Sequence, residues 1–126
     1  MQKQIVQTDK APAAIGPYSQ AIIIGDPVYT SGQLPLDPAT GTMPVAVADQ
    51  ARQSLRNIQA ILEAAGSSMD KVVKTTVFLK DMNTFAEMNA ACAEFFTEGT
   101  YPARSAVEVA RLPKDAMLEI EAIALK

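Results

Sequence analysis

The sequence predicts an α+β fold, a two-layer sandwich in which two helices cover one face of a β-sheet. Two segments repeat their apolar residues at spacings of three and four, as helices do. The other apolar segments are short and rich in β-branched residues, as strands are. The order is strand, strand, strand, helix, strand, helix, strand, strand. Strand–helix–strand connections are right-handed in nearly all sheets, so both helices should pack on the same face.

Composition is that of one soluble globular domain spanning residues 1–126, with 48% apolar and 20% charged residues. The net charge of −3, without a basic run, argues against nucleic acid as the main partner. No apolar run approaches the roughly 20 residues of a membrane span, and the N-terminus lacks the apolar core of a secretory signal. The single cysteine, Cys92, excludes an intramolecular disulfide, so a cytoplasmic location is expected.

The chain contains no histidine, which narrows the chemistry it can perform. A Ser-His-Asp triad and a Cys-His pair are excluded, and transition metals lose their commonest ligand. The Gly-rich phosphate loops and the GxSxG motif are also missing from the sequence. Acid–base chemistry must therefore use carboxylates, tyrosine, lysine or ordered water, and no metal or organic cofactor is expected.

The first third of the chain is predicted to supply three short strands. Ile5 and Val6 begin an edge strand, and residues 19–24 and 28–31 pair as a hairpin around Gly25. Two loops, residues 9–18 and 32–41, contain two prolines each. Long loops inside a compact domain are often functional, so both are of interest.

Two helices and a strand follow. Apolar residues at helical spacing predict a helix over residues 47–65, which Gly66 ends. The β-branched run of residues 72–79 reads as a strand covered on its faces. A capping box from Thr84 to Glu87 opens a second helix that should end near Gly99. The apolar stripe of this helix includes Cys92, which is interpreted as a core residue.

The last strands carry charged residues at strand spacing. Arg104, Ala106 and Glu108 share one face of the first strand, and Glu119 and Glu121 lie opposite the apolar face of the second. If the short LPKDA loop closes a simple hairpin, Glu119 lies near Glu108 and several residues along from Arg104. A small substrate and a water could fill that gap.

Each charged group has a functional and a structural interpretation. The planar guanidinium of Arg104 can bind a carboxylate through two parallel hydrogen bonds, or it can form an ion pair with Glu108 or with a glutamate on the next strand. Glu119 and Glu121 can raise each other's pKa in a dry site, or they can line a hydrated strand face. On the residues alone, the structural interpretation is favoured in both cases.

Three polar residues complete the candidates. Tyr18 and Ser31 each stand where a loop meets a strand, and residues in such places most often hydrogen-bond turns. Asn89 lies beside the apolar stripe of the second helix or on the surface.

The predicted sheet has one face without a helix, because both helices pack on the other face. Part of this uncovered face is apolar, which suggests that it is buried against a second copy of the chain.

Six motifs in order resemble the RidA/YjgF/YER057c/UK114 family closely and run along nearly the whole chain. They are AIGPYSQA, YTSGQLP, DQARQSLRNI, KTTVFLKDMN, YPARSAVEVARLPKDA and LEIEAIAL. The resemblance is best to the RidA subfamily. It implies a mixed six-stranded sheet of the YjgF/chorismate-mutase type and a homotrimer with active sites between subunits. It also implies hydrolysis of 2-aminoacrylate or 2-iminobutyrate to a 2-keto acid and ammonia, without a cofactor.

The resemblance implies a role for each candidate residue. Arg104 would bind the substrate carboxylate, and Glu119 would position and activate the attacking water. The backbone of Ser105 and Ala106 would frame the bound acid, and Asn89 would contribute from the same side. By the same resemblance, Tyr18 and Ser31 would come from the neighbouring subunit.

One position departs from the family pattern. Many members carry cysteine where this chain has Ala106, so a thiol-dependent role or an oxidation switch is not expected here. Two other functions stay open at the level of sequence. One is a non-enzymatic sensor of small carboxylates that uses Arg104. The other is a chaperone-like or ribonuclease role. The negative net charge and the lack of histidine argue against the ribonuclease role.

Overall fold

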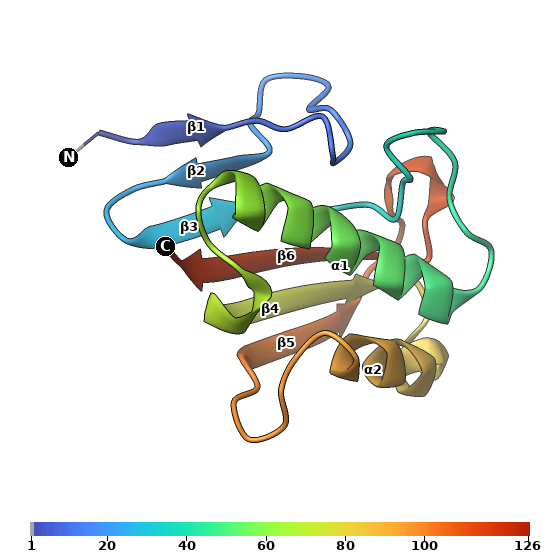
Figure 1. Ribbon diagram of the computed structural model, residues 1–126. Coiled ribbons are helices and arrows are strands. Elements are labelled where there is room, and N and C mark those ends of the chain that lie inside the picture. The colour runs from blue at the N-terminus through green and yellow to red at the C-terminus, as the bar shows by residue number, and fades with distance from the viewer. Residues whose placement is uncertain (1) are drawn as a thin grey trace.

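A mixed six-stranded sheet forms one layer of this computed structural model, which describes residues 2–126, and two helices form the other (Figure 1). The strands lie in the order β1-β2-β3-β6-β4-β5, and all neighbours are antiparallel except β4 and β5. The predicted α+β class is confirmed. The strands are β1 (Gln4–Val6), β2 (Ala21–Ile23), β3 (Pro27–Thr30), β4 (Val72–Leu79), β5 (Ala103–Glu108) and β6 (Leu118–Leu125).

The N-terminal strands agree with the prediction. Strand β1 is an edge strand, and β2 pairs with β3 so that Ile22 lies opposite Tyr29. Gly25 allows the tight connection between them because it adopts a positive φ of 65°. Strand β3 then pairs with β6, which joins this hairpin to the rest of the sheet.

Helix α1 (Val47–Ala64) supplies most of the helical side of the core. Its stripe of Leu55, Ile58 and Ile61 is at most 1% exposed. The helix ends at Ala64, one residue before the predicted end, and Gly66, whose φ of 84° suits a left-handed stop, follows two residues later. Burial of this stripe against the sheet is what holds the two layers together.

Helix α2 (Phe85–Ala93) begins where the capping box placed it, but the predicted capping interaction is absent and the helix ends earlier than predicted. The Thr84 side chain does not cap it; the Thr84 hydroxyl donates to the Asp81 carbonyl across a preceding 3-10 turn, Met82–Thr84. The helix also ends at Ala93, well before Gly99. Phenylalanine and threonine at positions 95–97 are weak helix formers, and Phe95 and Phe96 pack against the core from a turn.

The predicted hairpin of the last two strands is wrong, because β4 lies between them. Thr75 on β4 is paired with Arg104 on one side and with Ala122 on the other. Strand β4 is long and apolar, so it gains a partner along both of its edges. The connection from β5 to β6 contains a 3-10 turn, Pro113–Asp115, and spans β4 instead of closing a two-strand turn.

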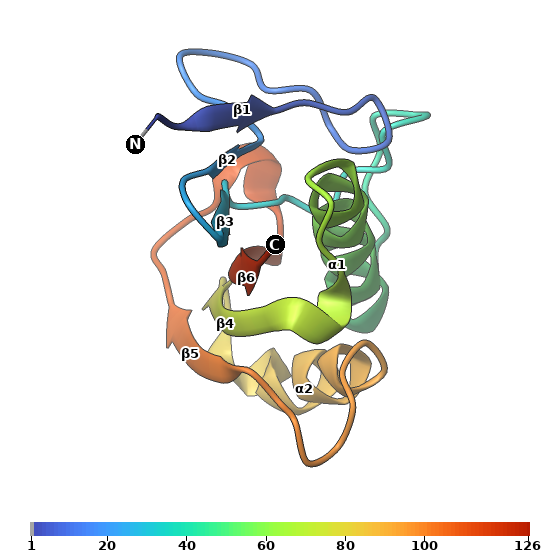
Figure 2. The ribbon, with the colours of Figure 1, turned by 60° about the vertical axis from the view of Figure 1, so that its left-hand side comes forward.

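The sheet has one covered and one open face, as predicted. Figure 2 shows α1 and α2 on the same side of the sheet. The open face carries Tyr29 and Val107, which are 40% and 44% exposed. Within residues 2–126, no helix is both long enough and apolar enough to cross a membrane.

Candidate active site

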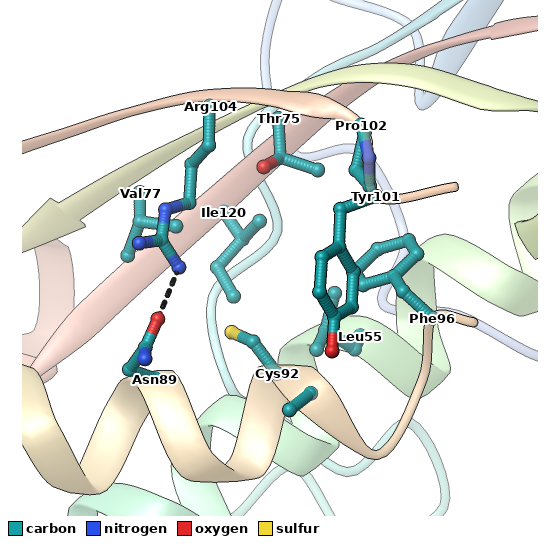
Figure 3. Close-up of a pocket in the computed structure, with 11 residues that line it drawn as sticks. Leu55, Thr75, Val77, Asn89, Cys92, Phe96, Tyr101, Pro102, Arg104 and Ile120 are labelled. Carbon is teal, nitrogen blue, oxygen red and sulfur yellow. Dashed lines mark hydrogen bonds between the residues drawn. The ribbon is translucent and has the colours of Figure 1, made fainter. Parts of the chain in front are cut away.

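Arg104 extends from β5 toward α2 on the helix-covered face of the sheet (Figure 3). Its Nη1 donates to Asn89 Oδ1 at 2.7 Å, and its guanidinium carbon lies 5.3 Å from the centre of the Phe85 ring. The amide and the ring hold the guanidinium in place without neutralising its charge. No local pattern in the sequence marks Phe85 as a partner of the arginine.

The alternative that Arg104 pairs with Glu108 is wrong. Glu108 turns to the 3-10 turn before α2, where its Oε1 accepts from the backbone N–H of Met82 at 2.8 Å. Among residues 2–126, Arg104 forms no salt bridge with any carboxylate. Its remaining N–H groups can therefore bind an external carboxylate.

A cavity of about 310 Å³ opens beside the Arg104 side chain, between α2 and strands β4 and β5 (Figure 3). Cys92 lies on its α2 side, and burial raises the pKa of this thiol to about 11, against a smaller opposing effect of Arg104. The thiol is therefore neutral near pH 7 and is a poor nucleophile. The interpretation of Cys92 as a buried core residue is confirmed.

Glu119 lies on the open face, opposite to the face from which Arg104 projects. It alternates along β6 with buried Leu118 and Ile120, whereas Arg104 is paired with buried Thr75. Burial raises the pKa of Glu119, and the nearby charge of Glu121 raises it further.

Gly32 packs directly against the carboxylate of Glu119. A Cβ added to Gly32 would lie 2.9 Å from Cδ of Glu119 and closer still to Oε1, so a larger residue here would displace the Glu119 side chain from its present position. The backbone pairing of Gln33 with Ile120 fixes this approach. Sequence reasoning missed Gly32 as a site residue, because a long-range contact leaves no local pattern.

Tyr18 and Ser31 lie on the same side as Glu119. Together with Tyr29 they line a shallow depression on the open side of the sheet. The Ser31 hydroxyl donates to the Ser19 carbonyl, and the Tyr18 hydroxyl accepts from the N–H of Ile15 at 3.2 Å. Tyr18 therefore makes the turn hydrogen bond that its position predicts, and it is half-exposed. The bond of Ser31 instead joins two segments twelve residues apart in sequence.

The side chains of Ser105 and Ala106 lie on opposite faces of the sheet. Ala106 is paired with Val77 and packs against the helix-side core, and Ser105 is paired with Thr76 toward the open face. Strand β5 is an edge strand, so backbone groups on its outer side have no strand partner. Such groups can bind a ligand oxygen.

The candidates therefore form two groups within one chain. Arg104 and Asn89 lie on the helix-covered face, and Glu119, Tyr18 and Ser31 lie on the open side. The expectation that Arg104 and Glu119 face one gap on a shared hairpin is wrong, because β4 separates their strands and their side chains leave opposite faces. Within residues 2–126, no group of three His, Cys, Asp or Glu residues is arranged to hold a metal ion.

Comparison with known proteins gives a consistent result. The family model described as Endoribonuclease L-PSP matches residues 8–126. A 2-iminobutanoate/2-iminopropanoate deaminase of Escherichia coli strain K12 is 58% identical over 123 residues, covering 96% of each chain. The crystal structure of the E. coli YjgF gene product is 58% identical, with a TM-score of 0.94 over 98% of each chain. E. coli TdcF, solved with bound serine, is 53% identical with the same TM-score and coverage.

Proposed function

The chain belongs to the YjgF/RidA family, which the Endoribonuclease L-PSP model describes, and we propose that it hydrolyses reactive 2-imino acids and their enamine forms to 2-keto acids and ammonia. The observation that carries the proposal is the guanidinium of Arg104, which is held beside a cavity and has no carboxylate partner among residues 2–126. The activity in the name of the E. coli relative supports it, and the serine bound to TdcF carries the same α-carboxylate as the proposed substrates.

Arg104 binds the substrate carboxylate in this proposal, and Asn89 holds the guanidinium in position through its 2.7 Å hydrogen bond. The backbone of Ser105 and Ala106 on the edge strand frames the acid. Such anchoring fixes the imine carbon relative to a water molecule, which lowers the entropic cost of their reaction.

Glu119 is the proposed base. The water oxygen bonds to the imine carbon, the C=N electron pair moves to nitrogen, and Glu119 accepts a proton from the water. Glu119 returns that proton to nitrogen, which completes the carbinolamine. It then carries the hydroxyl proton of the carbinolamine to nitrogen, so that the C–N bond breaks and ammonia leaves as the C=O bond forms. An enamine such as 2-aminoacrylate enters the same route after it tautomerises to the imine.

The two groups of residues require two chains if they act on one substrate. We infer that Arg104 and Asn89 of one copy face Glu119, Tyr18 and Ser31 of a neighbouring copy, in a homotrimer with three shared sites. Support comes from the placement of the groups on opposite faces and from the exposed apolar residues Tyr29 and Val107 on the open face.

The direct test follows pyruvate formation when a serine dehydratase generates 2-aminoacrylate in the presence of the protein. Wild type should accelerate the reaction above the spontaneous rate, and Arg104→Ala should abolish the acceleration. Glu119→Gln should lower the rate at least tenfold while calorimetry still detects 2-ketobutyrate binding, since loss of a general base typically costs about 10²–10⁴-fold.

Arg56→Ala is the matched control, because Arg56 is an exposed arginine on the outer side of α1. It should keep the wild-type rate. No acceleration by wild type, or unchanged rates in both site variants, would overturn the deaminase assignment. Binding of 2-keto acids without any turnover would favour a carboxylate sensor instead.

A further inference from the structure

Helix α1 carries three buried polar side chains in one row, next to its apolar stripe. Gln50, Ser54 and Asn57 are spaced by four and three residues, so they share one side of the helix, and each is at most 5% exposed. Burial of a polar group costs free energy unless it forms hydrogen bonds, and covering the sheet needs apolar side chains alone. The row, which lies within the DQARQSLRNI motif, therefore does more than pack against the sheet.

Gln50 joins two segments that are far apart in the sequence. Its Oε1 accepts from the N–H of Met117 at 2.9 Å, and its Nε2 donates to the carbonyl of Pro44 at 2.8 Å. Met117 lies directly before β6 and two residues before Glu119. Pro44 belongs to the segment between β3 and α1 in which Gly32 packs against the Glu119 carboxylate. One buried amide therefore connects both segments that surround this carboxylate.

The first half of β6 has little strand support on the side of β3. Strand β3 pairs with only the last three residues of β6. Nearer to the carboxylate, this side is held by an isolated bridge between Gln33 and Ile120 and by the N–H of Ala122, which donates to the Thr30 hydroxyl at 3.0 Å. The other side is paired with β4 along its length. The position of the segment after β3 thus decides how closely Glu119 is enclosed on this side.

We propose that Gln50 is a positioning residue for Glu119, because its two hydrogen bonds hold the segment that contains Gly32 against the carboxylate. The inference rests on the proposed deaminase function, in which Glu119 is the base. Gln50 touches neither the substrate nor the attacking water, and it acts through Met117 and Pro44. A fixed carboxylate can accept a proton from one oriented water, and a displacement of about 1 Å can cost roughly 10²-fold in rate.

The same enclosure affects the pKa of Glu119. Burial raises this pKa, and the charge of Glu121 on the same strand raises it further. The β4 partner of Glu119 is Phe78, Lys74 lies four residues before Phe78 in the sequence, and residues 31–33 on the other side carry no charge. If the segment after β3 moves away, water reaches the carboxylate and its pKa falls toward that of an ordinary glutamate.

Gln50→Met tests the proposal, because methionine has a similar length and can form neither hydrogen bond. In the pyruvate assay, the rate should fall about tenfold or more, and the acid limb of the pH profile should move to lower pH as the pKa of Glu119 falls. Calorimetry should show an affinity for 2-ketobutyrate within about twofold of wild type, since Arg104 still anchors the acid. Gln50→Glu keeps an acceptor for the Met117 N–H, so it should retain more of the rate than Gln50→Met.

Ser54→Ala is the matched control in the same row of α1. The Ser54 hydroxyl is buried and has no hydrogen-bond partner among residues 2–126, so its removal should leave the rate and the pH profile unchanged. If Gln50→Met does not fold, Gln50→Asn serves, because its side chain is one methylene shorter and cannot reach both partners. A folded Gln50 variant with the wild-type rate and pH profile would overturn the proposal, and so would an equal loss of rate in Ser54→Ala.

A titration of Glu119 by NMR separates this inference from the deaminase function. The carboxyl chemical shift measures the pKa of Glu119 without turnover, in wild type and in Gln50→Met. A lower pKa in the variant, with no imine hydrolysis by wild type, would overturn only the deaminase function. Imine hydrolysis by wild type, with the same pKa and rate in the variant, would overturn only the positioning role of Gln50.

Discussion

The carboxylate of Glu119 combines burial with a like-charged neighbour. Partial burial on the open face raises its pKa, and the charge of Glu121 raises it further. A raised pKa means that Glu119 holds its proton at a higher pH than an ordinary glutamate. It can therefore accept a proton from water only above that raised value, and activity should fall as the pH is lowered through it.

Replacement of Glu121 tests this electrostatic coupling. Glu121→Gln removes the neighbouring negative charge, so the pKa of Glu119 should fall and the acid limb of the kcat/KM profile should move to lower pH. Glu63→Gln, at an exposed position on α1, should leave the profile unchanged. A pH series of the coupled pyruvate assay measures both. An acid limb that stays in place in Glu121→Gln would show that Glu121 does not act on the titrating group.

A side chain at Gly32 should displace the carboxylate of Glu119. Gly32→Ala brings a Cβ against the end of a flexible side chain, which can rotate away, so we expect a strong loss of activity with a loss of at most about 1 kcal/mol in the free energy of unfolding. Urea denaturation measures the first effect. In the double variant with Glu119→Ala, most of the lost stability should return, because the colliding atoms are gone.

Gly41→Ala is the control for the double-variant experiment with Gly32→Ala and Glu119→Ala. Gly41 has a positive φ of 74° and open space around it, so alanine there costs backbone strain and no collision. The free energy of unfolding that Gly41→Ala removes should be the same with and without Glu119→Ala. Additive behaviour of Gly32→Ala would contradict the contact with Glu119.

Helix α1 does more than cover the sheet, because its buried amides hold the loops beside Glu119. Asn57 Nδ2 donates to the carbonyls of Leu34 and Leu36 at 3.1 and 2.9 Å, just after Gly32. Gln50 Oε1 accepts from the N–H of Met117 at 2.9 Å, just before β6. Both loops that flank Glu119 are thus fixed to one helix.

Asn57→Leu tests how much the hydrogen bonds from Asn57 to the loop carbonyls stabilise the fold. Leucine has a similar shape but leaves two buried carbonyls without a donor, which should cost about 1–3 kcal/mol of unfolding free energy. Gln53→Ala is the control, because Gln53 only donates to Asn57 from a partly exposed position, and it should cost less. Urea midpoints compare the two variants at equal slope. Equal costs would mean that the loop carbonyls find other donors.

At the scale of the whole molecule, the two faces of the sheet divide the proposed site between chains. Mixing Arg104→Ala with Glu119→Gln tests this division. After joint denaturation and refolding, some interfaces combine the intact Arg104 of one chain with the intact Glu119 of another. If assembly is random at equal amounts, about a quarter of the shared sites are restored.

The refolded mixture should therefore show about a quarter of wild-type activity in the pyruvate assay, where each variant refolded alone shows almost none. Light scattering checks that the mixture assembles to the same mass as wild type. No recovery in a correctly assembled mixture would place both residues of a site on one chain and overturn the shared-site proposal.

Much of this architecture could be predicted from local sequence. The apolar spacing of α1 and the β-branched run of β4 predicted both elements within about one residue. Strand alternation also predicted that Arg104 and Ala106 share one face and that Glu119 points away from Leu118. The premature end of α2 could not be predicted, because Phe96 leaves the helix to pack in a tertiary contact.

Local patterns of the sequence were enough to predict which elements form, which residues share a face of each element, and which functional groups a chain without histidine can use. The position of β4 between β5 and β6, the opposite faces from which Arg104 and Glu119 project, and the contact of Gly32 with Glu119 became known from the fold alone. The physical reason is that periodicity is a local property of the chain, whereas strand order and register depend on hydrogen bonds and packing between segments far apart in sequence.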